Sequence, residues 1–206
     1  MSSNNRRVRL SAAGLVFALA IASALPAAAQ SCPAAAATIH IDNFGRINAN
    51  YYRGAQPEGQ DYADLAALGI KAVIDLTDDD GSPAEAAAVK NVGMAFFHIP
   101  MNTHRPPSRD ELAQFLTIVD NPANQPVYVH CVGGRHRTGV MTAVYRMTQD
   151  NWTADKAFAE MKQYKYGADF LHPEFKKFVY GFQADSALAA AAPARAAAVA
   201  ETRGVK

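Results

Sequence analysis

A cysteine and an arginine stand six positions apart, on either side of a loop that contains two glycines, within residues 127–139. An apolar run ends at Cys131, and a helix-forming run over residues 140–147 follows Arg137, so the segment predicts a strand, a loop and a helix. A loop at such a junction points backbone N–H groups toward an anion, and the helix dipole adds to their field. This field favours both a bound phosphate and the ionised thiolate of Cys131. The Arg137 fork can hold two phosphate oxygens.

A simpler interpretation of Cys131 must be weighed against this one. A lone cysteine at the end of a buried strand is usually a small core residue. Here Cys131 is followed by five residues, Arg137 and Thr138, and the whole unit stands between an apolar strand and a helix. We therefore interpret Cys131 as the nucleophile of a phosphate site.

Four residues, His130, Cys131, Arg137 and Thr138, match the signature His-Cys-x5-Arg-Ser/Thr. In these residues the chain resembles the cysteine-dependent tyrosine and dual-specificity protein phosphatases, and it is most similar to their compact bacterial members, which include periplasmic proteins. The resemblance spans roughly residues 40–183 and continues through residues 52–57, 69–76, 98–100 and 143–146.

The resemblance implies a role for each signature residue. Cys131 would attack phosphorus while Arg137 holds the equatorial oxygens, and water would then hydrolyse the phosphocysteine. Thr138 would hydrogen-bond Cys131 and assist its departure, and His130 would support the loop from behind. The phosphate would lie against the loop residues Val132, Gly133, Gly134, Arg135 and His136. Neither a metal nor another cofactor is implied, because the loop and Arg137 supply the charge stabilisation.

The general acid departs from the pattern of the compact family members. These usually carry an aspartate three or four residues after an Ile-Pro strand end, where this chain has Thr103 and His104. Three alternatives remain: His104 by its position, Asp110 as the next downstream carboxylate, and one of the acids at positions 78–80. Asp110 would also be favoured in the first turn of a helix for its interaction with the dipole alone. We favour His104.

The substrate is less evident from the sequence than the reaction. Arg135 and His136 would add positive charge beside Arg137, which suits a substrate with several phosphates. A phosphorylated protein is the main hypothesis and an inositol polyphosphate or pyrophosphate the second, because the loop also resembles that of the plant and fungal atypical branch. A rhodanese-type sulfurtransferase and an inactive phosphate-binding module are weaker alternatives.

The first 29 residues predict a signal peptide. Arg6, Arg7 and Arg9 precede an apolar run over residues 15–24, which is too short for a membrane span, and small residues at 26–29 offer a cleavage site. Cleavage would leave 17 Lys+Arg against 19 Asp+Glu, a formal charge of about −2, which does not suggest a nucleic-acid partner. We expect an exported monomer, periplasmic or secreted, that is not inserted in the membrane. Cys32 would be a free thiol or, alternatively, a redox partner of Cys131.

Residues 40–183 predict one α/β domain with a central, mostly parallel sheet of four or five strands flanked by helices. A linker at 30–39 would precede the domain, and an Ala-rich tail would follow it at 184–206. The expected strands are residues 46–53 at an edge, 71–76, 95–99 and 127–130. The expected helices are 61–68, 82–91, one that begins at Ser108, 153–164 and 173–183, and the second and third begin with the capping boxes Ser82/Glu85 and Ser108/Glu111. The helix that begins at Ser108 would carry an apolar face of Leu112, Phe115, Leu116 and Val119.

Overall fold

The computed structural model describes residues 39–78 and 82–184. The predicted signal peptide, Cys32, two of the three acids at positions 78–80 and the Ala-rich tail from residue 185 lie outside these ranges. Within the described ranges, no helix combines the length and the apolar character that a membrane crossing requires.

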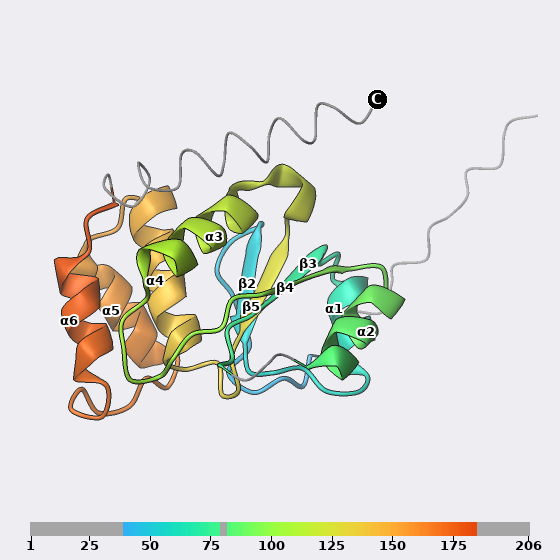
Figure 1. Ribbon diagram of the computed structural model, residues 1–206, viewed down its shortest axis with the longest axis horizontal. Coiled ribbons are helices and arrows are strands. Elements are labelled where there is room, and N and C mark those ends of the chain that lie inside the picture. Colours follow the sequence, from blue (N-terminus) through green and yellow to red (C-terminus); the bar gives the residue numbers. More distant parts are fainter. Residues whose placement is uncertain (1–38, 79–81, 185–206) are drawn as a thin grey trace, which may run out of the picture. The chain divides into compact units, whose positions relative to one another are not determined.

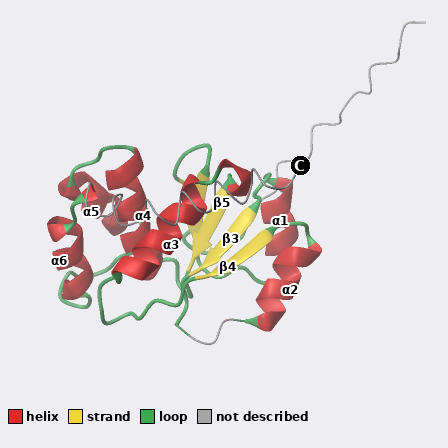
Figure 2. Ribbon diagram, turned by 45° about the horizontal axis from the view of Figure 1, so that its top comes forward, coloured by secondary structure: helices red, strands yellow, loops and turns green. Residues whose placement is uncertain are grey.

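A five-stranded sheet lies between two layers of helices (Figures 1 and 2). Its strands, in the spatial order β1-β2-β5-β3-β4, are β1 (Gly45–Arg46), β2 (Tyr51–Gly54), β5 (Val127–His130), β3 (Ala72–Asp75) and β4 (Ala95–His98). The helices are α1 (Asp61–Ala67), α2 (Pro83–Asn91), α3 (Arg109–Asp120), α4 (Arg137–Gln149), α5 (Ala154–Gln163) and α6 (Pro173–Gly181), with a short 3-10 turn η1 (Pro122–Asn124). All strand pairs are parallel except β1 with β2, which confirms the predicted fold class.

Side chains alternate along the strands between two apolar layers. On β5, Val127 and Val129 pack with α3 to α6, whereas Tyr128 packs on the opposite face with α1 and α2. Neighbouring strands repeat the pattern, because Cβ atoms point to opposite faces of a sheet at successive residues. The central strands are buried on both faces, as parallel strands covered by helices usually are.

The expected single strand over residues 46–53 is wrong. The chain reverses within it, so that β1 and β2 form an antiparallel hairpin in which Gly45 pairs with Arg53. Asn48 stabilises the reversal, because its side-chain oxygen accepts a hydrogen bond from the Asn50 N–H at 2.8 Å. β2 is consequently an interior strand beside β5, and only β1 lies at the edge.

The two predicted capping boxes have different outcomes. At α3, Ser108 and Glu111 exchange both hydrogen bonds, and the predicted apolar face is buried: Leu112, Phe115, Leu116 and Val119. At α2, Ser82 accepts from the Glu85 N–H at 3.1 Å, but the Glu85 side chain turns into the core instead of returning to Ser82.

Phe115 should be among the largest single contributors to stability, because it is fully buried and its ring meets Tyr51 edge to face. We expect Phe115→Ala to lower the free energy of unfolding by about 3–5 kcal/mol, measured by urea denaturation. The exposed neighbour Gln114 on the same helix provides the control, and Gln114→Ala should change stability by less than about 0.5 kcal/mol. Similar losses in both variants would contradict the assignment of the core to this face of α3.

Candidate active site

The end of β5, the loop that follows it and the first turn of α4 enclose a cavity of about 240 Å³. Cys131 lies in this cavity, only 4% exposed, and Arg137 lines it at the start of α4. The complete lining is Thr103, Cys131, Val132, Gly133, Arg135, His136 and Arg137. The tertiary structure therefore brings the predicted nucleophile and the predicted phosphate-binding arginine to one site, at the C-terminal edge of the parallel strands where ligands of such sheets bind.

The Arg137 guanidinium is held from one side. Its Nη1 donates to Asp78 Oδ1 at 2.9 Å and to the Met101 carbonyl at 3.2 Å. Nε and Nη2 make no hydrogen bond to a described residue. The two protein contacts therefore orient the fork while leaving two donor nitrogens for phosphate oxygens.

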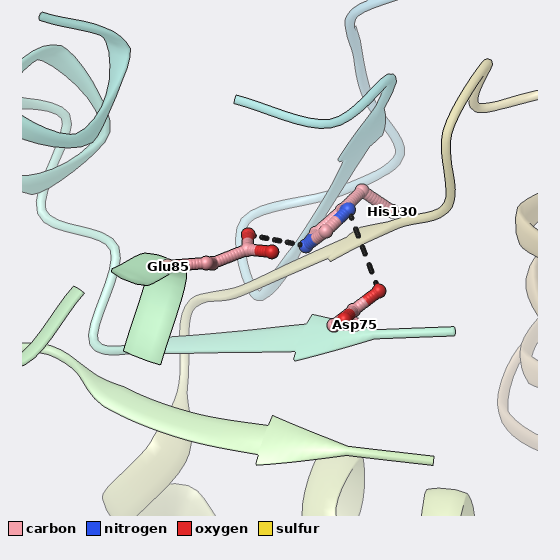
Figure 3. A group of neighbouring side chains, drawn as sticks. All are labelled: Asp75, Glu85 and His130. Carbon is pink, nitrogen blue, oxygen red and sulfur yellow. Dashed lines mark ion pairs between the residues drawn. The ribbon is translucent and has the colours of Figure 1, made fainter. Parts of the chain in front are cut away.

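His130 and two carboxylates form a buried cluster behind the loop (Figure 3). His130 Nε2 lies 3.0 Å from Glu85 Oε1, and His130 Nδ1 lies 3.9 Å from Asp75 Oδ1. The close contact with Glu85 has the distance of an ion pair but not the angles of a hydrogen bond. The Glu85 side chain makes this contact and does not return to Ser82, so α2 packs against the residue directly before Cys131.

Asp75, Glu85 and His130 are also the one group of side chains in the described ranges whose donor atoms could surround a metal ion. Both Asp75 oxygens already accept hydrogen bonds from Thr77, from its N–H and from its hydroxyl, each at 2.9 Å. None of the three residues lines the cavity. We therefore interpret the cluster as support: Asp75 fixes the turn at Thr77, and the next residue, Asp78, contacts Arg137.

Two predicted phosphate-site residues have other positions or partners. Gly134 does not line the cavity; it packs on β2, where a Cβ atom would lie 2.3 Å from the Gly54 carbonyl, and its φ of +61° favours glycine. Thr138 is fully buried, and its hydroxyl has no hydrogen-bond partner among the described residues. The hydrogen bond expected between Thr138 and Cys131 is therefore absent from this structure.

The charge of the cavity also differs from the expectation. The His136 Nε2–H donates to the Tyr166 carbonyl at 3.0 Å, and the His136 ring packs on His172 with 3.8 Å between centroids. Burial, and secondly the neighbouring His172, lower the pKa of His136 below its ordinary value. Its imidazole is consequently neutral at neutral pH, and the expected positive charge is not supplied by His136. Arg135 does supply one, although exposed Asp42 lies 3.8 Å away.

The family model described as a DSP-PTPase phosphatase fused to NAD+ kinase matches residues 40–177. This range contains the whole sheet, the two residues that Arg137 contacts (Asp78 and Met101) and every residue that lines the cavity. The chain belongs to this DSP-PTPase phosphatase family. It is accordingly a cysteine-dependent phosphatase of the protein-tyrosine-phosphatase type, as the signature predicted.

Named relatives are phosphatases of two kinds. The probable tyrosine-protein phosphatase DG1060 of Dictyostelium discoideum is 32% identical over 126 residues, which are 59% of this chain and 75% of that protein. The dual specificity protein phosphatase TpbA of Pseudomonas aeruginosa is 27% identical over 183 residues, 86% of this chain and 82% of TpbA. The inositol diphosphatase SIW14 of Saccharomyces cerevisiae is 28% identical over 130 residues, 61% of this chain and 46% of SIW14.

Solved structures of these relatives share the fold. The TpbA crystal structure aligns with a TM-score of 0.62 at 27% identity, over 73% of this chain and 91% of that one. The SIW14 catalytic core aligns with a TM-score of 0.64 at 26% identity, over 74% of this chain and 93% of that one. The fold described above is therefore shared with both relatives.

The three candidates for the general acid occupy different places. His104 is exposed beside the cavity-lining Thr103, and its ring centroid lies 6.2 Å from that of His172. Asp110 is exposed in the first turn of α3 and does not line the cavity. Asp78 is the acid of the 78–80 run that the structure describes, and it is bound to Arg137.

Several residues of the site were not anticipated from the sequence. His172 lies between the loop after β4 and α6, where its Nδ1 is 3.2 Å from the Thr103 carbonyl and 3.3 Å from Glu174 Oε1. Asn43 and Arg53 hold the loop at Gly134. The sequence offered only a weak indication of a role for Arg53. It is a charged residue directly after two tyrosines, within a segment that resembles the family.

The roles of His104 and Asp78 can be separated by the leaving group. We expect His104→Ala to lower turnover of a phosphotyrosine peptide about 10²-fold or more, and that of p-nitrophenyl phosphate much less, because the nitrophenolate needs less protonation. Steady-state rates of the variant and the wild type are measured on both substrates.

Asp78→Asn is the matched comparison for this test. It should reduce both substrates equally, because Asp78 acts through the orientation of Arg137. The reverse pattern, an equal loss for His104→Ala and a leaving-group-dependent loss for Asp78→Asn, would transfer the acid role to Asp78.

Proposed function

We propose that this protein hydrolyses phosphotyrosine on protein substrates through a phosphocysteine intermediate. The observation that carries the proposal is the joint presence of Cys131 and Arg137 in one cavity at the start of α4. The similarity to TpbA supports the substrate class, because TpbA is a dual specificity protein phosphatase, and a cysteine-to-serine variant of it was crystallised in complex with pTyr.

In the first step, the Cys131 thiolate attacks phosphorus and the bond to the tyrosyl oxygen breaks. The leaving oxygen receives a proton, in our proposal from His104. Nε and Nη2 of Arg137 hold two phosphoryl oxygens, while the N–H groups before α4 hold the others. The dipole of α4 stabilises the negative charge throughout this step.

In the second step, water attacks the phosphorus of the phosphocysteine and the S–P bond breaks. The deprotonated acid of the first step now removes the proton from water, and inorganic phosphate leaves with the thiolate restored. The Thr138 hydroxyl is buried and has no partner in the described part of the chain, so it is available to donate a hydrogen bond to the departing sulfur. This mechanism requires no metal ion.

Two features of the cavity bear on the substrate. Val132 lines the opening and is 63% exposed, so an apolar surface is available to an aromatic ring or a peptide. Arg135 is the observation that favours a second candidate, an inositol polyphosphate or pyrophosphate, because it places another cation in the cavity. The likeness to SIW14, an inositol diphosphatase, supports the same alternative.

We also propose that the protein acts after export, in the periplasm or outside the cell, as its first 29 residues suggest. N-terminal sequencing of the protein recovered from the periplasmic fraction should give a mature chain that begins near residue 30. An intact N-terminus in the cytoplasmic fraction would contradict export.

The phosphatase reaction is tested by substitution of the two central residues. Cys131→Ser should abolish phosphate release from a phosphotyrosine peptide while vanadate still binds, because the loop N–H groups and Arg137 remain. Arg137→Lys should keep less than about a tenth of kcat/KM, a loss above ~1.4 kcal/mol, since an ammonium cannot replace the two-nitrogen contact.

Arg46 on the edge strand β1 is exposed and supplies the control. Arg46→Lys should retain wild-type kcat/KM. Full activity of Cys131→Ser would rule out the cysteine mechanism. Faster phosphate release from inositol pyrophosphate than from the peptide would favour the second candidate substrate.

A further inference from the structure

Arg53 is a fully buried cation that no described carboxylate neutralises. Its side chain has no exposed surface, and its Nε and Nη1 atoms have no hydrogen-bond partner within residues 39–78 and 82–184. The guanidinium lies over the Tyr164 ring, with 4.2 Å between its central carbon and the ring centroid. Glu160, a carboxylate whose charge raises the pKa of Arg53, is itself paired with Arg146 at 2.6 Å.

Such a residue opposes folding. Burial lowers the pKa of Arg53 below its ordinary value, but an arginine keeps its charge at neutral pH. An uncompensated buried charge costs several kcal/mol, and an apolar side chain of similar volume is often more stable at such a position. The presence of a charge here therefore calls for a role other than stability.

Among the described residues, the one hydrogen-bond partner of the Arg53 side chain is in the signature loop. Nη2 donates to the Gly134 carbonyl, which also accepts from Asn43 Nδ2 at 2.7 Å. Asn43 is itself fixed by a second hydrogen bond, to the Tyr164 carbonyl at 2.9 Å. Gly134 is thus held against β2 by two donors and by its close contact with Gly54.

The direction of this carbonyl determines the direction of the next N–H. In a planar trans peptide, the C=O and the following N–H point to opposite sides. The donors draw the Gly134 oxygen away from the cavity, which Gly134 does not line. The N–H of Arg135, a residue that does line the cavity, is therefore directed toward the position of a phosphate.

The charge of Arg53 acts on the same place. β2 runs parallel to β5, and Arg53 pairs with Val129, two residues before Cys131. An attraction between Arg53 and Cys131 is among the interactions of this guanidinium. The anions that enter this region are the thiolate and the phosphate, so a cation already in place stabilises them without reorganisation.

We propose that Arg53 is a positioning residue of the active site: from behind the loop, its guanidinium fixes the Gly134 peptide in the phosphate-binding orientation and stabilises the Cys131 thiolate. This inference rests on the proposed phosphatase function. Arg53 touches neither the cavity nor the reacting atoms, so it acts through the loop and through its charge.

Three variants separate the two effects. Arg53→Met removes the hydrogen bond and the charge but keeps much of the apolar volume, Arg53→Lys keeps the charge, and Asn43→Ala removes the second donor to Gly134 without a change of charge. Arg46→Met, on the exposed neighbouring strand β1, is the control for loss of an arginine. Each protein is assayed for its melting temperature, its vanadate affinity and the pH dependence of Cys131 alkylation by iodoacetamide.

We expect Arg53→Met to weaken vanadate binding about 10- to 100-fold and to raise the midpoint of the alkylation profile by about one pH unit. Its melting temperature should equal or exceed that of the wild type, because an unpaired buried charge is removed. Arg53→Lys should keep the wild-type midpoint but bind vanadate more weakly. Asn43→Ala should likewise keep the wild-type midpoint and bind vanadate more weakly. Arg46→Met should match the wild type in melting temperature, vanadate affinity and alkylation midpoint.

An unchanged midpoint and unchanged vanadate affinity in Arg53→Met would show that Arg53 is only a packing residue. If that variant does not fold, wild-type vanadate affinity in both Arg53→Lys and Asn43→Ala would equally overturn the proposal. A wild-type protein that alkylates normally but releases no phosphate from any phosphomonoester would instead count against the proposed function. The alkylation profiles would still decide the role of Arg53, because they need no substrate.

Discussion

The need to stabilise negative charge in a small, mostly buried cavity governs this structure. A thiolate and a phosphate must lie side by side, although their charges repel. The N-terminus of α4 meets part of this need with its dipole and free N–H groups, and Arg137 meets another part with a formal charge. Both operate only while the loop of residues 131–136 keeps a single conformation, so the surrounding elements act mainly to fix that loop.

The support comes from both sides of the sheet. From α2, Glu85 contacts His130, and from β3, Asp75 fixes the turn that brings Asp78 to Arg137. From β2, Arg53 holds the Gly134 carbonyl. Burial of these charged side chains costs desolvation free energy, so they do not favour stability by themselves. They are placed where they orient the groups that would contact the phosphate, so the buried polar groups are concentrated at the functional site.

The surroundings of the cavity moderate its charge. His136 is drawn into contact with Tyr166 and His172, and its lowered pKa leaves it neutral at neutral pH. Arg135 is partly balanced by Asp42. The cavity thus combines one well-fixed arginine, one exposed arginine and an apolar rim at Val132. This combination suits a single aryl phosphate and still admits a substrate with additional phosphates, which agrees with relatives of both kinds.

The sequence by itself determined the features that depend on local order. The strand, loop and helix around Cys131, the capping box at Ser108 and the apolar face of α3 all follow from neighbouring residues, and their chemistry predicted the reaction. Only the tertiary structure decided which groups meet across the sheet. The position of Glu85 in the sequence predicts a helix cap, but its side chain contacts His130 instead. The position of Arg53 predicts a cation on an edge strand, but its side chain is buried behind the loop. The hairpin at residues 45–54 and the neutral state of His136 likewise depend on partners distant in the chain. Local propensity cannot specify such contacts, because burial and charge at one residue are set by elements that the sequence places far away.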